Sequence, residues 1–368
     1  MTVELPNEKR VTIKKLIEKT RKLNTCKIRD FAKCLGTIVS CCPAIKYSWL
    51  YTKNLERRKF LALESNNNNY DSIMSLNPYI NDFDWWKSQI MVGENSIEPL
   101  EFILEIFSDA SLTCWGIFCN NEKTNGHWDE NERKANINIL ELKAAFFGLK
   151  CYAKDAVNCN ILMRIDNTTA ISYMNRMGGI QYKHLNDIAR EIWQWCEKRN
   201  IYIFASYINT KDNIEADAES RKLEPETEYE LANYAFERIV QVFGKPDIDL
   251  FASRINTKCH RYISWKKVPD SEAVDAFTLC RKREYFYAFP PFSIILKVLR
   301  KIKKDKSEGL LILPDWPRQP WYPLFRSMLS SEPIIFKPNN NLLISPNRGQ
   351  HPLQKKLTMM CRKVSGRR

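Results

Sequence analysis

The sequence predicts an α/β protein in which a mixed sheet flanked by helices lies between a helical module and a second α/β region. Three observations support this fold class. A nearly continuous apolar run, FILEIF at 102–107, ends in Ser-Asp, as expected for a strand buried on both faces. From there to about residue 222, strand-like and helix-like segments alternate. Outside this span, both the apolar spacing and the composition change.

Length and composition limit the class of protein further. With 368 residues and 44% hydrophobic residues, the chain suits two or three domains that each bury a core. No apolar run reaches the roughly 20 residues that span a bilayer, and the start, MTVELPNEKR, is charged where a signal peptide is apolar. We therefore expect a soluble protein of the cytoplasm or nucleus that is neither secreted nor bound to a membrane.

The charged residues indicate what kind of partner the protein binds, and the cysteines indicate whether its thiols are reduced. The net charge of +14 and the pI near 9.1 indicate an anionic partner, most commonly nucleic acid. Many basic residues belong to solvated helix faces such as KRVTIKKLIEKTRK, so charge alone leaves this partner open. The 12 cysteines include no CxxC pair, and we interpret them as reduced thiols that serve as small buried residues.

The first region, residues 1–97, is expected to be a small helical module. Apolar residues have helical spacing at 8–23, at 27–39 and from about 45 to 63. The polar run 65–69 then has the composition of a linker.

The second region, residues 98–222, contains the expected sheet. Strands are predicted at 102–107, 114–119, 161–166 and 201–208, and helices at 139–150, at 185–196 and after 213. The residues between the second strand and the first helix form a polar stretch. The order of strands and helices favours a mixed sheet covered by helices.

The third region, residues 223–350, is richer in aromatic residues and proline and is expected to be a second α/β domain. Its segments include FGKPDIDLFASRINTKCHRYISW, YAFPPF and LLILPDWPRQPWYP. Residues 351–368 close the chain, and we expect them to be a weakly structured basic tail.

Carboxylates of the second region fall where an active site on such a sheet would be built. Asp109 and Asp166 each end a predicted strand, and Glu141 lies in the expected first turn of a helix whose same-face residues are small. Asp217 lies in DNIEADAESR, where Asn213 could fix the turn into a final helix.

Clustered carboxylates repel one another unless cations hold them together. Oxygen ligands with little histidine or thiolate nearby favour Mg²⁺ or Mn²⁺ over zinc. Two such ions, about 4 Å apart, can activate a water on one side of a phosphodiester and stabilise the leaving oxygen on the other.

Four segments, SDAS, NILELKAA, RIDNTTAISYMNRMGG and NIEADAESR, resemble in this order the ribonuclease H domain of retroelement reverse transcriptases. The resemblance implies a mixed five-stranded sheet and cleavage of the RNA strand of RNA/DNA hybrids with two Mg²⁺ ions, or Mn²⁺. It makes Asp109 the bridging ligand. The catalytic metal ligands it implies are Asp109, Glu141, Asp166 and Asp217, and the expected nucleic-acid contacts are Ser111, Asn167 and Asn213.

The sequence departs from this family before the last helix. Tyr207 to Thr210 stand where related domains often have His-Ile-Pro-Gly, so the histidine associated with proton transfer or product release is missing. His127 and His184 are interpreted as surface residues, not as replacements. This departure puts the rate in doubt more than the reaction. Strand-end and helix-start acids also occur without any metal, so a catalytically decayed module that only binds nucleic acid stays open.

The first region is similar to the thumb and connection that precede ribonuclease H in DIRS-type and gypsy-like reverse transcriptases. The segments concerned are FAKCLGTIVSCCPAIKYSWLYTKNLERRK and DFDWWKSQI. No Tyr-x-Asp-Asp motif is present, so we expect no primer extension by this chain, and the polymerase part would be a partner. Trp85 and Trp86 are interpreted as interface residues.

The third region is similar to the domain that follows ribonuclease H in DIRS-type elements and resembles phage DNA adenine methyltransferases. The motif at 289–292 is FPPF, where those enzymes have Asn-Pro-Pro-Tyr or Asp-Pro-Pro-Tyr. Phe289 cannot accept a hydrogen bond from a target amine, so we expect a methyltransferase-like fold with lost or altered activity.

An active adenine methyltransferase is the alternative for this region. It would have to bind S-adenosylmethionine near residues 249–253, where the usual glycine-rich loop is absent. DNA binding is expected to persist through Arg254, Lys258, Arg261 and the basic residues after Lys297.

Overall fold

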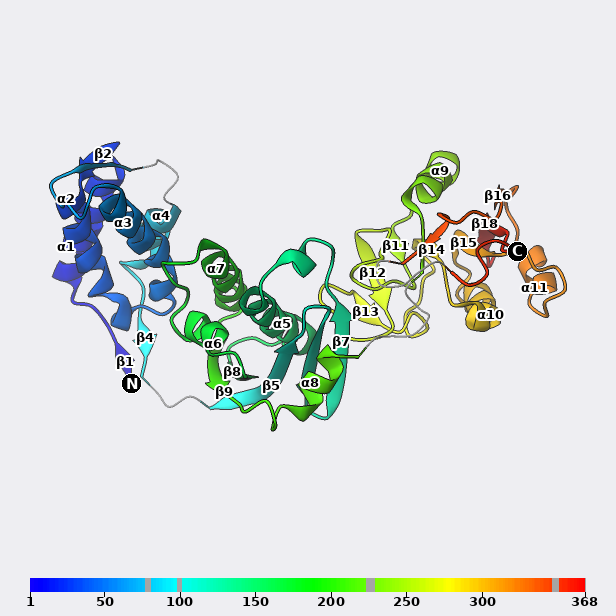
Figure 1. Cartoon of the computed structure of the whole chain (residues 1–368), viewed down its shortest axis with the longest axis horizontal. Helices are drawn as coiled ribbons and strands as arrows, with labels where there is room; N and C mark the ends of the chain where they lie inside the picture. Colours follow the sequence, from blue (N-terminus) through cyan, green and yellow to red (C-terminus); the bar gives the residue numbers. More distant parts are fainter. Residues whose placement is uncertain (77–80, 98–100, 223–228, 346–350, 368) are drawn as a thin grey trace.

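The computed structural model describes residues 1–76, 81–97, 101–222, 229–345 and 351–367. Three bodies follow one another along the long axis of the molecule, and their central elements are helices, a five-stranded sheet and a seven-stranded sheet (Figure 1). The expected boundaries after residues 97 and 222 adjoin segments outside the described residues. In the described part of the chain, no helix combines the length and the apolar character needed to cross a membrane.

The N-terminal body is built mainly from helices. Its α-helices are α1 (Asn7–Arg21), α2 (Ile28–Val39), α3 (Lys53–Ser65) and α4 (Asn81–Gln89), with short 3-10 helices η1 (Cys42–Ala44) and η2 (Ser48–Tyr51). Two small antiparallel pairs complete it, β1 (Thr2–Val3) with β4 (Asn95–Ser96) and β2 (Thr25–Lys27) with β3 (Ile73–Ser75).

The helices expected at 8–23 and 27–39 are confirmed as α1 and α2. The prediction of one helix from about 45 to 63 is wrong, because Tyr47 has a left-handed φ of 61°, which a continuous α-helix does not allow. Only the part from Lys53 onward forms α3.

The middle body contains the five-stranded sheet. Its strands are β5 (Phe102–Ala110), β6 (Cys114–Cys119), β7 (Glu122–His127), β8 (Asn160–Ile165) and β9 (Tyr202–Tyr207). In space they are ordered β7-β6-β5-β8-β9, with antiparallel pairing from β7 to β5 and parallel pairing from β5 to β9. The expected mixed five-stranded sheet with flanking helices is therefore confirmed.

Helices cover both faces of this sheet. The helices α5 (Ile137–Tyr152), α6 (Thr168–Asn175) and α7 (Lys183–Glu197) lie on one face, and α8 (Ile214–Ser220) lies on the other (Figure 1). The short 3-10 helix η3 (Glu132–Lys134) precedes α5. The close approach of α8 to β6 depends on Gly116 of β6, where an added Cβ would lie 2.2 Å from the carbonyl oxygen of Ala216. This glycine allows α8 to lie against the central strands.

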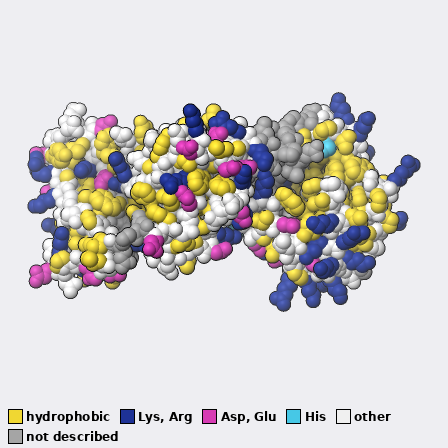
Figure 2. All heavy atoms as spheres, turned by 90° about the horizontal axis from the view of Figure 1, so that it is seen from below, with side chains coloured by type: hydrophobic (Ala, Val, Ile, Leu, Met, Phe, Trp, Pro, Cys, Tyr) yellow, Lys and Arg dark blue, Asp and Glu magenta, His cyan; other side chains and the backbone are white. Residues whose placement is uncertain are grey.

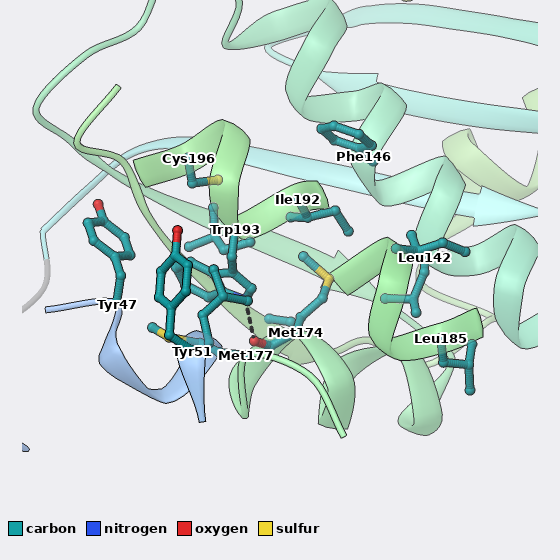
Figure 3. Packing of buried hydrophobic residues seen from close by; sticks show 14 of the residues in the cluster. Tyr47, Tyr51, Leu142, Phe146, Met174, Met177, Leu185, Ile192, Trp193 and Cys196 are labelled. Atoms are coloured by element: carbon teal, nitrogen blue, oxygen red, sulfur yellow. Dashed lines mark hydrogen bonds between the residues drawn. The ribbon is translucent and has the colours of Figure 1, made fainter. Parts of the chain in front are cut away.

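The N-terminal body packs directly on α7 and shares one hydrophobic cluster with the middle body (Figure 3). The Tyr47 ring lies 6.1 Å from the Trp193 ring, and the Tyr47 hydroxyl donates to the backbone oxygen of Ile201 at 2.8 Å. The indole of Trp85 donates to Glu197 of α7 at 2.8 Å, while Trp86 is fully buried. Trp85 thus lies at this junction, and Trp86 donates to the backbone oxygen of Tyr51 within the N-terminal body.

The C-terminal body contains the seven-stranded sheet, ordered β13-β12-β11-β14-β15-β18-β16. The first five strands of this order are mutually parallel, and β18 runs antiparallel between β15 and β16. The strands are β11 (Ile248–Asp249), β12 (Arg261–Ser264), β13 (Ala273–Val274), β14 (Tyr285–Ala288), β15 (Glu308–Pro314), β16 (Ile334–Phe336) and β18 (Met359–Ser365).

Helices and one small strand pair surround this sheet. The helices are α9 (Asn233–Phe243), η4 (Phe292–Ile294), α10 (Ile295–Asp305) and α11 (Tyr322–Ser327), and β10 (Glu230–Leu231) pairs with β17 (Leu343–Ile344). A second α/β unit after the central one therefore agrees with the predicted fold class.

The prediction of a weakly structured tail at 351–368 is wrong. Strand β18 pairs with β15 along its whole length, from Pro314 opposite Met359 to Glu308 opposite Ser365. Its apolar side chains enter the core, while Arg362 and Lys363 stay partly exposed. The sequence prediction missed this strand because basic residues dominate the composition of the segment, although most of the residues of β18 that are buried are apolar.

The C-terminal body contacts the middle body mainly through polar groups near β7. Arg254 pairs with Glu132, and Lys267 pairs with Glu122. Lys150 of α5 lies 3.0 Å from Asp270. This junction is therefore richer in ion pairs than the apolar packing on α7.

Candidate metal centre

Three carboxylates meet at one edge of the five-stranded sheet. Asp109 lies near the end of β5, Asp166 directly follows β8, and Glu141 projects from α5. One oxygen from each residue lies within 4.8 Å of the oxygens of the other two. Because β5 and β8 are parallel neighbours, their carboxyl ends lie at the same edge. The strand pairing thus brings two acids together and α5 adds the third.

Glu141 lies in the second turn of α5 and not in the first as expected, because the helix begins two residues earlier. The side chain of Asn136 caps the helix by accepting from the backbone N–H of Ile139 at 3.1 Å, so the helix begins at Ile137. Gly148, on the same face, would place an added Cβ 2.9 Å from Ile106 of β5. Small residues on this face let α5 approach the sheet and bring Glu141 to the strand ends.

Burial shapes the charge state of this group. Burial, reinforced by the charges of Asp109 and Asp166, raises the pKa of Glu141 to about 9. Burial also raises the pKa of Asp109, with a hydrogen bond from Ser220 opposing this and the charges of Asp166 and Asp217 adding to it. Without a cation, Glu141 is therefore expected to hold a proton at neutral pH.

One carboxylate oxygen has no donor. Oε2 of Glu141 is buried and makes no hydrogen bond within the described residues. A buried oxygen without a partner is costly unless a cation or a donor satisfies it. Three converging carboxylates with such an oxygen fit a hard divalent cation, so these residues could hold Mg²⁺ or Mn²⁺.

Asp217 lies near this group but outside it. Arg221, one helical turn further along α8, donates from Nε at 2.9 Å and from Nη2 at 2.6 Å to one oxygen of Asp217. The charge of Asp217 still acts on Asp109 and helps to raise its pKa. Three of the four expected ligands are thus together, and the fourth is held by a neighbouring guanidinium.

Two hydroxyl groups that the sequence did not single out hold the acids in place. Ser220 donates to Asp109, and Thr210 donates to Asp166 at 2.8 Å. Ser220 follows Asp217 by three residues, a helical spacing that could have identified it. Thr210 lies in the loop after β9, and its sequence position gives no such signal.

The expected nucleic-acid contacts have structural partners. Ser111 accepts from the backbone N–H of Cys114 at 3.0 Å and donates to the oxygen of Ser220 at 2.7 Å, and Asn167 caps α6 by accepting from Ala170 at 2.9 Å. Asn213 is only 1% exposed, which leaves it no surface for nucleic acid.

The role expected for Asn213 at the start of α8 also differs. Its side chain makes no capping hydrogen bond, and it donates instead to the backbone oxygen of Ser108 at 3.2 Å. This bond ties the start of α8 to β5.

Neither histidine of the middle body that the sequence singled out belongs to the acid cluster. His184 is exposed, as expected. The expectation that His127 is a surface residue is wrong, since it is 5% exposed and its Nδ1 lies 3.1 Å from the sulfur of Cys114. Tyr207, at the end of β9, is 55% exposed.

The C-terminal body has a cavity of about 740 Å³, lined by the FPPF motif and by residues of the middle body including Trp115 and His127. Asp249, at the end of β11, is buried nearby and accepts the backbone N–H groups of Phe251 and Lys258 at 3.3 and 3.0 Å. Burial raises the pKa of Asp249 to about 6, and these two hydrogen bonds oppose the shift. Its carboxylate is thus satisfied by the protein itself.

Neither a protein-family model nor a curated protein matches the sequence. Parts of the chain are similar to solved structures, at low scores. Ribonuclease H1 of the halophilic archaeon Halobacterium salinarum NRC-1 is 14% identical with a TM-score of 0.27, over 32% of this chain and 92% of that chain.

A foamy viral protease-reverse transcriptase is similar in two complexes. With an RNA/DNA hybrid it is 13% identical with a TM-score of 0.21, over 60% of this chain and 30% of that chain. With double-stranded DNA, a form named dRH is 12% identical with a TM-score of 0.21, over 55% and 35%. The chain therefore spans about a third of the viral protein.

Proposed function

We propose that this chain is a metal-dependent ribonuclease that cleaves the RNA strand of RNA/DNA hybrids. The observation that carries the proposal is the convergence of Asp109, Glu141 and Asp166, of which the first two are buried, with one oxygen of Glu141 making no hydrogen bond within the described residues. The order of these acids along the chain and the β7-β6-β5-β8-β9 sheet support the same activity.

The proposed site would hold Mg²⁺, or Mn²⁺, through the three clustered carboxylates, with Asp109 as the shared ligand. When bound, two such ions would activate the attacking water and stabilise the leaving oxygen. The hydroxyl of Ser220 fixes the orientation of Asp109, and that of Thr210 fixes Asp166. Asp217 would complete the ligand set once it leaves the guanidinium of Arg221.

The substrate would be recognised by the shape of the hybrid and by its backbone and 2′-hydroxyl groups, with little sequence preference. Tyr207, the last residue of β9, stands where a histidine that assists proton transfer or product release would be expected. We therefore propose a slower reaction of the same type.

We further propose that the chain is part of a reverse transcriptase polyprotein of a DIRS-type or gypsy-like retrotransposon. Residues 1–97 would be the thumb and connection, 98–222 the ribonuclease H domain, and 223–350 a methyltransferase-like domain. The helical body packed on α7 is consistent with a connection, and a polymerase part would be the partner.

The methyltransferase-like assignment is supported by the sheet order, in which six strands run in one direction and β18 is inserted antiparallel between β15 and β16. The cavity beside FPPF lies near Asp249, at the carboxyl end of β11, where parallel α/β sheets commonly bind ligands. Phe289 offers no polar acceptor, so we propose that this domain has lost or altered its transfer activity.

The deciding experiment is cleavage of a hybrid with a labelled RNA strand by the purified chain, with Mg²⁺, with Mn²⁺ and with EDTA. Cleavage that needs the metal, and that spares a DNA duplex of the same sequence, supports the proposal. A folded chain that binds the hybrid but does not cut it in either metal would instead identify a catalytically decayed binding module.

A further inference from the structure

The charge of the molecule is concentrated in its last quarter. Residues 281–368 contain 19 Lys and Arg against 5 Asp and Glu, a surplus of 14 that equals the net charge of the whole chain. Residues 1–280 contain 38 of each kind and are balanced. In the space-filling view, Lys and Arg side chains crowd the C-terminal end of the molecule, where few acidic side chains are visible (Figure 2).

Helix α10 organises much of this charge. Its buried face is apolar, with Ile295, Val298, Leu299 and Ile302 fully covered. The helix ends at Lys306, whose φ of 51° is left-handed, and Arg367 from the chain end donates to the Lys306 carbonyl oxygen at 3.4 Å. We define the α10 basic face as six exposed residues: Lys297, Arg300, Lys303, Lys304, Lys306 and Arg367.

Within the part of the chain that the structure describes, these six cations have no carboxylate partner. Among the described residues, none has a carboxylate within ion-pair distance, and the ion pair within α10 joins Lys301, which is outside this set, to Asp305. Lys297 instead lies 3.9 Å from the centre of the Phe277 ring. Their mutual repulsion destabilises the folded chain unless an anion offsets it.

The helix dipole explains only part of the pattern. Cations in the last turn, such as Lys303 and Lys304, are stabilised by the negative end of the helix. Lys297 and Arg300 lie before that turn, and Arg367 belongs to the chain end. The helix dipole stabilises only the cations near the helix end, whereas the phosphates of a nucleic-acid strand could pair with all six.

Three of the basic residues expected from the sequence to bind DNA, those before Lys297, have carboxylate partners within the protein. Arg254 pairs with Glu132 of the middle body, Lys258 with Glu230, and Arg261 with Glu272. The positive charges of these three residues are thus already offset by carboxylates, so the basic residues after Lys297 are the stronger candidates for DNA contacts, and both expectations stay predictions.

We propose that the α10 basic face binds the sugar–phosphate backbone of nucleic acid without reading its sequence. It is a second contact surface, on a different body from the carboxylate cluster, and it does not depend on metal or on cleavage. Its effect would be to hold a strand on the molecule while the central site acts.

The test compares two triple variants of the full chain that each remove three positive charges. The first changes Arg300→Gln, Lys303→Gln and Lys304→Gln. The control changes Arg21→Gln, Arg29→Gln and Lys183→Gln, which are exposed cations already paired with carboxylates. Binding to a fluorescent RNA/DNA hybrid is measured in EDTA over a range of salt concentrations, so that no cleavage is required, and single-stranded DNA of equal length is the second probe.

The α10 variant is expected to bind the hybrid at least about tenfold more weakly near 0.1 M salt, and to lower the slope of log K against log salt by about 2 to 3, because each lost phosphate contact removes about 0.7–0.9. The control should stay near wild type. Loss on one probe only tells which form of nucleic acid the face prefers. Equal behaviour of the two variants on both probes, with equal melting temperatures, overturns the proposal.

Discussion

Two buried aspartates near the ends of sheet strands have opposite surroundings. Asp109 lies beside Glu141 and Asp166, and Ser220 donates to it. The carboxylate of Asp249 instead accepts hydrogen bonds from the backbone N–H groups of Phe251 and Lys258, in the segment that follows β11. Burial raises the pKa of both. The difference indicates that burial of an acid does not by itself point to a metal, whereas several converging acids with an unsatisfied oxygen fit one.

The largest expected effect separates these two residues. Asp109→Asn should lower hybrid cleavage on the order of a thousandfold or more, since a bound metal is worth several kcal/mol and each 1.36 kcal/mol is about tenfold. Asp249→Asn should leave the cleavage rate within about twofold and lower the melting temperature, because an amide cannot replace the second acceptor oxygen. Initial rates and thermal melts of the two variants test the comparison directly.

The outcome that breaks the comparison is a fast Asp109→Asn enzyme. If this variant is folded by circular dichroism and cleaves at the wild-type rate, the shared-ligand assignment is wrong. Loss of cleavage in a folded Asp249→Asn variant would mean that the C-terminal body takes part in the reaction.

The next effect concerns the FPPF motif on the sheet of Asp249. Stabilising an attacking amine by one preorganised acceptor is worth about 3 kcal/mol, roughly a hundredfold in rate, and Phe289 offers none. We therefore expect no detectable methyl transfer to DNA from labelled S-adenosylmethionine. Phe289→Asn and Phe289→Asp test whether the acceptor alone is missing. Robust transfer by the unmodified chain would make the protein bifunctional.

The sheet around the acid cluster was largely predictable from sequence, because its central strands have simple patterns. FILEIF is followed by Ser-Asp and ILMRID ends in Asp, and parallel pairing of these two strands brings Asp109 and Asp166 together. Strand β7 was not predictable in this way. Its buried Thr124 and Asn125 bind the backbone oxygens of Lys267 and Glu219, so polar side chains fill positions where apolar ones were sought.

The candidate site was predictable only in part for a related reason. Spacing indicates which residues share a helix face, but it does not decide which of two partners an acid takes. Asp217 and Arg221 are four residues apart in α8, and in the structure this local pair keeps Asp217 out of the carboxylate group. The orienting hydroxyl of Thr210 comes from a loop, where periodicity gives no information.

A smaller effect is expected from pH and Glu141. Its pKa rises from an ordinary 4.5 to about 9 in the folded chain. Between these values the folded state binds more protons than the unfolded state, so without metal the unfolding free energy should fall as pH rises. Glu141→Gln removes the titration of this group, so its unfolding free energy should depend less on pH than that of the wild type. Each kcal/mol of difference in unfolding free energy should separate the melting temperatures of the two proteins by about 2–4 °C.

The control for this prediction is the metal. Adding Mg²⁺ at pH 7 should release protons from the wild type, because a carboxylate ligand must be deprotonated, and Glu141→Gln should release fewer. If the melting temperatures of the two proteins change in the same way from pH 5 to 9, the raised pKa of Glu141 is contradicted.

The smallest effect tests why Asp217 stays outside the cluster. Arg221 is 68% exposed at its side chain and holds one oxygen of Asp217. Exposed ion pairs contribute about 0.2–1 kcal/mol, so Arg221→Gln should lower the Mg²⁺ concentration for half-maximal cleavage by up to about fivefold. The difference should shrink at high salt, since exposed charges are screened. Lys222→Gln, which removes the partner of Glu219 in the same segment, is the matched control and should leave the Mg²⁺ requirement unchanged. A higher Mg²⁺ requirement in Arg221→Gln would mean that the guanidinium supports the site instead of competing for its fourth ligand.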